Sequence, residues 1–139
     1  MIQQTTPYGI GTVVPLPYQV AVDETCRQLA REGFGVLTEI DVAATLKQKL
    51  NAEFRPYVIL GACNPALAHQ ALQAERDIGL LLPCNVVVYA GDAPGESVVT
   101  AMDPVEALRL TGNDRIQPLA EEVRRRLQRV LERVAASAA

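Results

Sequence analysis

A continuous apolar run in the middle of the chain constrains the fold more than any other feature of the sequence. Residues 57–62 carry no charged side chain and lead directly into Cys63, Asn64 and Pro65. A run of this length that ends in polar and turn-forming residues is typical of a strand at the centre of a sheet. The chain is therefore expected to build a sheet around this segment.

Shorter patterns on either side of this run predict the remaining elements. Further strands are expected at residues 11–16, 34–40, 85–89 and 97–102. Helices are expected at residues 18–32, just after Asp41, at 64–76 and at 118–135. This arrangement predicts the α+β class, with residues 1–139 as a single domain. The sheet is expected to be mixed, with about five strands and with helices packed on one face.

Charge and composition exclude several classes of partner. The net charge is −3, and the chain has only four Tyr, two Phe and no Trp. It therefore lacks the basic surface of a nucleic-acid-binding protein, and its aromatics are expected to be too scattered to form a stacking platform. No apolar run approaches the roughly 20 residues of a membrane helix. The first residues do not resemble a signal peptide, and the odd number of cysteines does not suggest a disulfide framework. We expect a cytoplasmic protein that binds neither nucleic acid nor membranes.

The C-terminal helix allows two interpretations. Five arginines lie on it, and nearby glutamates suggest that these charges form an ordinary solvated face. Its apolar residues recur at helical spacing and could pack inside the chain or against a second copy. These residues are Leu119, Val123, Leu127, Val130 and Val134.

Chemically reactive side chains gather between Cys63 and Cys84. Each of these cysteines is followed by an asparagine, Asn64 or Asn85, and the only histidine, His69, lies between them. Cys63 comes just before a predicted helix, where the backbone dipoles favour a thiolate. His69 falls outside the apolar stripe of that helix, so core packing does not readily account for it.

Three functions fit this constellation and stay open. Cys63, Cys84 and His69 could bind a soft metal such as Zn²⁺ or Cu⁺. Alternatively, Cys63 could be a nucleophile or redox thiol, with Cys84 as the resolving thiol and His69 as the base. The amides of Asn64 and Asn85, together with the start of the predicted helix, could instead bind a small ligand with a polar or anionic group. The simplest alternative is that both thiols are small buried hydrophobes and both asparagines are cap or turn residues.

Lysine is the second unusual feature. The chain contains 13 basic residues, of which only Lys47 and Lys49 are lysines. Burial can tune an ammonium group for use as a base or a nucleophile, whereas a guanidinium stays charged. Lys49 is the better candidate because Leu46 and Leu50 flank it on the predicted core side. The alternative is an exposed residue of an ordinary amphipathic helix.

Four segments in order along the chain resemble one known family. Residues 33–42, 45–50, 61–65 and 79–89 are similar to the bacterial and archaeal family named Domain of Unknown Function 302. The resemblance covers about residues 9–104. It implies a small α+β fold related to half of the TATA-binding protein, and a homodimer, but no activity. The family motif falls on Glu39, Asp41, Thr45, Lys49, Cys63, Asn64, Pro65, Pro83, Cys84 and Asn85.

Together these observations predict a cytoplasmic homodimer that binds a small ligand or a soft metal near Cys63 and Cys84. An enzyme that uses Cys63 or Lys49 is the first alternative. A structural or interaction module without a catalytic site is the second. The expected ligand contacts are Glu39, Asp41, Lys49, Cys63, Asn64, Cys84 and Asn85.

Overall fold

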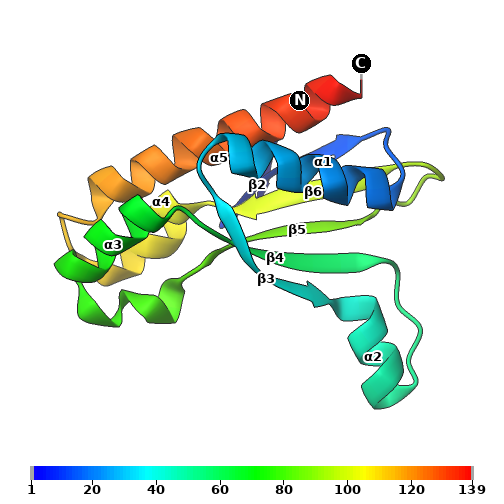
Figure 1. Cartoon of the computed structure of the whole chain (residues 1–139), viewed down its shortest axis with the longest axis horizontal. Coiled ribbons are helices and arrows are strands. Elements are labelled where there is room, and N and C mark those ends of the chain that lie inside the picture. The colour runs from blue at the N-terminus through cyan, green and yellow to red at the C-terminus, as the bar shows by residue number, and fades with distance from the viewer. Residues whose placement is uncertain (1, 139) are drawn as a thin grey trace.

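The chain forms a six-stranded antiparallel sheet with its two longest helices on one face. The computed structural model describes residues 2–138. The strands lie in the order β1-β2-β6-β5-β4-β3, and all five neighbouring pairs are antiparallel. α1 (Tyr18–Arg31) and α5 (Gln117–Ser137) cover the same face (Figure 1). The strands are β1 (Gln3–Thr6), β2 (Gly9–Val14), β3 (Gly35–Asp41), β4 (Tyr57–Cys63), β5 (Cys84–Ala90) and β6 (Ser97–Met102).

The shorter helices lie at the two ends of the sheet. α2 (Val42–Leu50) follows β3 and projects away from the sheet (Figure 1). At the opposite end, α3 (Pro65–Ala74) and the 3₁₀ helix η1 (Arg76–Leu81) connect β4 to β5. α4 (Pro104–Ala107) and the 3₁₀ helix η2 (Leu108–Thr111) connect β6 to α5 at that same end.

The sheet is buried on its helix-covered face alone. Successive strand side chains point to opposite faces, so every second residue of β4, β5 and β6 reaches the helices. On β4, Val58 and Leu60 are buried, whereas Ile59 between them is partly exposed. The main core unites these strand residues with Leu127, Val130, Leu131 and Val134 of α5. The face away from the helices, here called the open face, has no covering layer within the described chain.

A smaller core lies at the end of the sheet that carries α3. Its buried residues are Ala71, Ile78, Leu108, Ile116 and Ala120. Ala120 belongs to the first turns of α5, so this one helix packs against both cores. The candidate site lies at the boundary between the two cores.

The α+β class is confirmed, but the sheet has six strands and none of them is parallel to its neighbour. β1 was not expected because its polar residues Gln3, Gln4 and Thr5 are exposed on an edge strand, where burial imposes no apolar alternation. Strands β3 to β6 follow one another as an antiparallel meander, and β2 joins that meander beside β6. This connectivity leaves no parallel pair.

Most of the apolar stripe of α5 packs inside the chain. Leu127, Val130 and Val134 are buried in the main core. On the polar side, Arg126 pairs with Glu122 at the expected spacing of four residues, whereas Arg125 also pairs with Glu122 and Arg124 reaches Asp103 at 3.1 Å. No helix within residues 2–138 is long and apolar enough to cross a membrane.

Glu32, at the C-terminal end of α1, is bound by three arginines of α5. Its carboxylate accepts a hydrogen bond from Arg129 Nη2 at 2.9 Å and another from Arg133 Nη1. Its backbone carbonyl accepts from Arg126 Nη1 at 3.1 Å. The Glu32 side chain is 9% exposed, and the bonds from Arg129 and Arg133 hold its pKa below the ordinary value of 4.5. These contacts fix the C-terminal half of α5 to the end of α1.

We expect Glu32→Gln to lower the free energy of unfolding by about 1–2 kcal/mol at neutral pH, because it removes the carboxylate that accepts charge-assisted hydrogen bonds from Nε and Nη2 of Arg129 and from Arg133. A carboxyl whose pKa is lowered by folding stabilises the native state above its unfolded pKa, and this contribution is lost as the pH falls. The difference between wild type and variant should therefore shrink below pH 4.5. Urea unfolding across this pH range measures it.

The matched control is Glu132→Gln, which changes an exposed glutamate of α5 that forms no ion pair among residues 2–138. This variant should stay within about 0.5 kcal/mol of wild type. An equal loss in both variants, or a Glu32→Gln effect that is independent of pH, would contradict the role assigned to Glu32.

Candidate functional site

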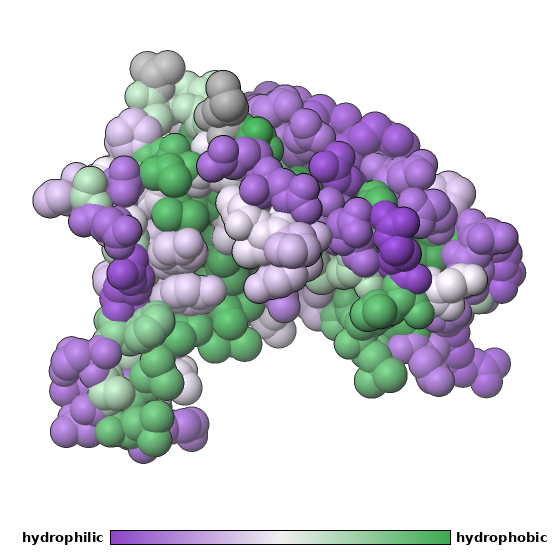
Figure 2. All heavy atoms as spheres, turned by 180° about the vertical axis from the view of Figure 1, so that it is seen from behind, coloured by the Kyte–Doolittle hydropathy of each residue, from purple (hydrophilic) through white to green (hydrophobic). Residues whose placement is uncertain are grey.

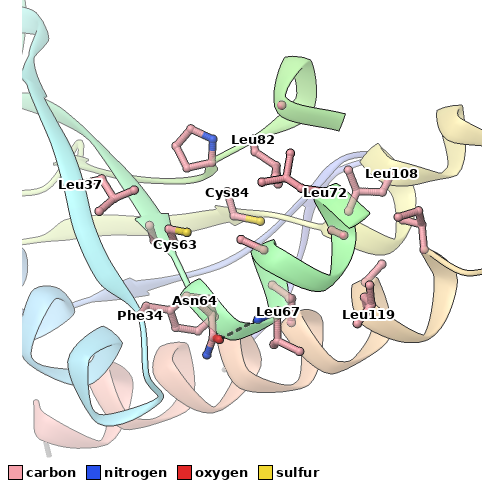
Figure 3. Close-up of a pocket in the computed structure, with 18 residues that line it drawn as sticks. Phe34, Leu37, Cys63, Asn64, Leu67, Leu72, Leu82, Cys84, Leu108 and Leu119 are labelled. Carbon is pink, nitrogen blue, oxygen red and sulfur yellow. Dashed lines mark hydrogen bonds between the residues drawn. The ribbon is translucent and has the colours of Figure 1, made fainter. Parts of the chain in front are cut away.

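An apolar pocket of about 320 Å³ lies where the two cores meet. The main core contributes Phe34, Ala62 and Cys84, and the smaller core contributes Ala71, Leu108, Ile116 and Ala120. Leucines of α3, α5 and the segment before β5 complete the wall (Figure 3). The pocket is thus a hollow between the two cores that neither core fills.

Strand pairing brings Cys63 and Cys84 to this pocket. β4 and β5 are neighbours, and Ala62, the residue before Cys63, lies directly opposite Cys84. Figure 3 shows both sulfurs at the pocket, beside α3. Cys63 is partly exposed, whereas Cys84 is buried.

Cys84 is held as a neutral thiol. Burial raises its pKa to about 12, and the neighbouring Cys63 adds to this shift. Burial disfavours the charged form because a thiolate is poorly solvated among apolar side chains. Cys84 is therefore a poor thiolate ligand and a poor nucleophile at physiological pH.

Asn64 serves as the N-cap of α3. Its Oδ1 accepts a hydrogen bond from the backbone N–H of Leu67 at 3.2 Å, and Pro65 occupies the first turn (Figure 3). Both features are preferred at helix starts. Asn64 is 8% exposed and packs close to Gly33, whose φ of 84° favours glycine. Asn64 therefore lines the pocket mainly as a structural residue.

The three residues expected to hold a metal are not brought together. His69 is exposed and does not line the pocket that contains Cys63 and Cys84. Ala71, two residues later, is buried, and two residues correspond to roughly 200° around a helix, so α3 turns His69 outward. Within residues 2–138, no group of three or more His, Cys, Asp and Glu side chains is placed to hold a metal ion.

The residues expected to contact a polar ligand are also dispersed. Asn85 follows Cys84 on β5 and therefore points to the open face, where it lines a different pocket. Lys49 is exposed on the projecting helix α2. Glu39 and Asp41 lie on the edge strand β3, and Asp41 Oδ1 caps α2 by accepting from the Ala44 N–H at 2.9 Å. The pocket around Asn64, Asn85 and Lys49 that the sequence predicts is not formed.

Sequence reasoning missed the apolar residues that make up most of the pocket wall. Leu67 and Leu72 come from α3, Leu82 precedes β5, and Leu119 and Val123 come from α5. One signal was available: an apolar run at residues 80–83 stands in a connecting segment, where polar residues are more usual. The contribution of α5 has no such signal, because it depends on how that helix packs.

Comparisons with known proteins agree with the resemblance seen in the sequence. The sequence profile of the family described as Domain of unknown function DUF302 matches residues 10–134. The crystal structure of an uncharacterized conserved DUF302 protein from Bacillus stearothermophilus is similar, with 27% identity and a TM-score of 0.84. The alignment covers 91% of this chain and 98% of that chain. The search of curated proteins gave no match. The family match extends through most of α5, well beyond residue 104.

We expect iodoacetamide to alkylate Cys63 first in the native protein and to leave Cys84 unmodified. Cys84 is buried and has a raised pKa, whereas Cys63 is partly exposed at the pocket. Cys26 should also react slowly, because burial and then the carboxylates of Glu39 and Asp23 raise its pKa. Peptide mass spectrometry measures the order. All three should react at similar rates in denaturant, and native Cys84 reacting as fast as Cys63 would contradict the burial described here.

Proposed function

Since this chain belongs to the family Domain of unknown function DUF302, which has no assigned activity, we propose a function from its geometry: it binds a small apolar molecule in the pocket beside Cys63 and Cys84. The chemistry of the wall carries this proposal. Eighteen residues line the pocket, and none of them is Asp, Glu, Lys, Arg or His. Binding pockets for small molecules are mostly apolar with few polar groups, and this volume is at the lower end of the typical range of roughly 300–1,000 Å³.

The polar groups of the wall support an apolar ligand over an ion. Cys84 is neutral, and the Oδ1 atom of Asn64 is already bonded to the start of α3. A metal ion or an anion would therefore find little charge compensation in this pocket. An apolar molecule that buries about 200 Å² of its surface gains about 5 kcal/mol from leaving water, and this gain offsets the entropic cost of association.

Catalysis by Cys63 or Lys49 has less support. A nucleophilic cysteine is usually activated by a neighbouring base, and the wall of this pocket supplies no His or carboxylate to Cys63. Lys49 belongs to α2, none of whose residues is buried, so it lacks the burial that would tune an amine. Binding without chemistry is therefore the favoured function.

We propose further that the protein is a homodimer in which α2 packs against α2 of a second copy. α2 buries no residue in its own chain although it carries apolar side chains. Leu50 is 71% exposed, and Phe54, just after the helix, is 49% exposed. A twofold axis beside α2 would bring these residues together in both copies, since a symmetric dimer uses the same patch twice.

The neighbouring strand β3 favours a dimer held by side-chain contacts over a dimer in which the two sheets pair edge to edge. β3 is an edge strand, and edge strands can pair with a second chain. However, β3 has a bulge between Val36 and Thr38 and carries Glu39 and Asp41, two devices that discourage edge pairing. We place this dimer in the reducing cytoplasm, a location supported by three free thiols.

To test ligand binding, we expect N-phenyl-1-naphthylamine, an uncharged apolar fluorophore, to bind with one site per chain. Ala68→Phe should weaken binding at least tenfold, because Ala68 lines the pocket and the larger ring would occupy it. Ala66→Phe is the matched control, because Ala66 is exposed on the same helix outside the pocket. Fluorescence titration measures both. An unsaturable signal, or equal affinity in both variants, would reject the proposed function.

To test assembly, we expect light scattering to give twice the chain mass of 15.0 kDa for wild type. Leu50→Lys should give the monomer mass, because a charge would lie at the proposed contact. Leu110→Lys changes a leucine on η2 that is even more exposed, at 82%, and should leave the dimer intact. A wild-type mass of 15.0 kDa would overturn the dimer proposal.

A further inference from the structure

A second pocket lies on the open face of the sheet, on the side away from α1 and α5. Its volume is about 460 Å³, and it shares no lining residue with the pocket at Cys63. Figure 2 shows the molecule from behind, hollowed on this side between α2 and the end that carries α3. The lining comes from β1, β2, β4, β5, β6 and the β1–β2 turn, and includes Tyr8, Tyr57, Asn85, Tyr89 and Thr100.

The scarce aromatic residues of the chain are concentrated here. Four of its six aromatics, Tyr8, Phe54, Tyr57 and Tyr89, lie in or beside this pocket. Tyr57 and Tyr89 face each other across β4 and β5, with ring centroids 5.2 Å apart and planes within 5° of parallel. Phe54 extends the group, with its centroid 6.0 Å from that of Tyr57. The expectation that the aromatics are scattered is wrong for these four, because strand pairing unites residues far apart in sequence.

Uncharged hydrogen-bonding groups surround these rings. Within residues 2–138, the hydroxyls of Tyr8, Tyr57 and Tyr89 and the side-chain amide of Asn85 have no hydrogen-bond partner. Burial, with smaller contributions from Tyr89 and Tyr8, raises the pKa of Tyr57, so its hydroxyl stays protonated. No lining residue is charged. The pocket thus offers neutral donors and acceptors beside flat apolar surfaces.

Gly9 leaves the base of this pocket free of a side chain. Gly9 lines the pocket, and a Cβ atom at that position would lie 3.0 Å from the hydroxyl oxygens of Thr5 and Thr6. Thr5 Oγ1 also lies 2.9 Å from Thr100 Oγ1, which ties β1 to the strand beyond β2. A larger residue at Gly9 would displace these threonines, so the glycine preserves both the strand contact and the space above it.

We propose that this open-face pocket binds an uncharged ring compound that carries hydroxyl groups, the chemistry shared by neutral sugars and nucleosides. Aromatic side chains provide surfaces on which such rings stack. The tyrosine hydroxyls, Asn85 and the threonines can exchange hydrogen bonds with ligand hydroxyls. A phosphorylated form would bind poorly, because the lining supplies no cation and the chain has a net charge of −3. The site is independent of the pocket at Cys63.

The test is calorimetric titration of the full chain with methyl glucoside, uridine and uridine monophosphate. We expect saturable binding of one neutral compound, which identifies the source of the ring, and at least tenfold weaker binding of its phosphorylated counterpart. Asn85→Ala and Tyr89→Phe should each weaken binding about tenfold, because each removes hydrogen-bonding groups and leaves the strand in place. Val13→Ala, on the same face outside the pocket, and Ala68→Phe, in the other pocket, should leave the affinity unchanged.

Four results would overturn this proposal. The first is that neither neutral compound binds. The second is that uridine monophosphate binds as tightly as uridine, because the uncharged lining would then not govern selectivity. The third is that Asn85→Ala and Tyr89→Phe bind as wild type does. The fourth is that these variants convert a dimer to a monomer in light scattering, which would assign the face to a second copy. The proposal that the Cys63 pocket binds an apolar molecule is tested separately, by titration with N-phenyl-1-naphthylamine.

Discussion

α5 packs its apolar stripe across one face of the sheet, and the contacts of this helix determine where the remaining surfaces lie. Leu127, Val130, Leu131 and Val134 are buried against the central strands, and together they contribute about 6–12 kcal/mol of hydrophobic stabilisation as an upper estimate. The arginines that bind Glu32 hold the C-terminal half of the helix to α1. The N-terminal half extends past the strands and reaches the smaller core. One helix thus packs against a larger and a smaller core, and the Cys63 pocket is the space left between them.

The same one-sided packing leaves the other face of the sheet open. Cys84 and Asn85 illustrate the consequence, because these consecutive residues of β5 line two different pockets. One pocket is apolar and contains a neutral thiol, and the other combines tyrosine rings with uncharged polar groups. The alternation of side chains along a strand is what separates these two environments. A motif that is continuous in sequence is therefore divided between two sites in space.

Much of the architecture could be predicted because local patterns and burial agree. The apolar run at residues 57–62 lies within β4, between β3 and β5, and the N-caps Asp41 and Asn64 begin α2 and α3 as their side chains suggest. The resemblance to the family is confirmed over residues 10–134. Prediction failed where contacts with residues distant in sequence decide which way a side chain points or which strand an edge strand pairs with. His69 is turned outward by α3, and β1 is a polar edge strand that, within residues 2–138, pairs with β2 alone.

The sequence by itself determined the α+β class, the family, most element positions and the place of the two cysteines at the ends of successive strands. These features follow from propensities, caps and hydrophobic periodicity, which act over a few residues. Only the tertiary structure decided that Cys84 is a neutral thiol, that α5 closes the apolar pocket, and that four aromatics meet on the open face. Each of these depends on contacts between residues more than 20 positions apart. The pairing of strands distant in the chain and the packing of a terminal helix set such contacts, and local periodicity does not specify which elements become neighbours.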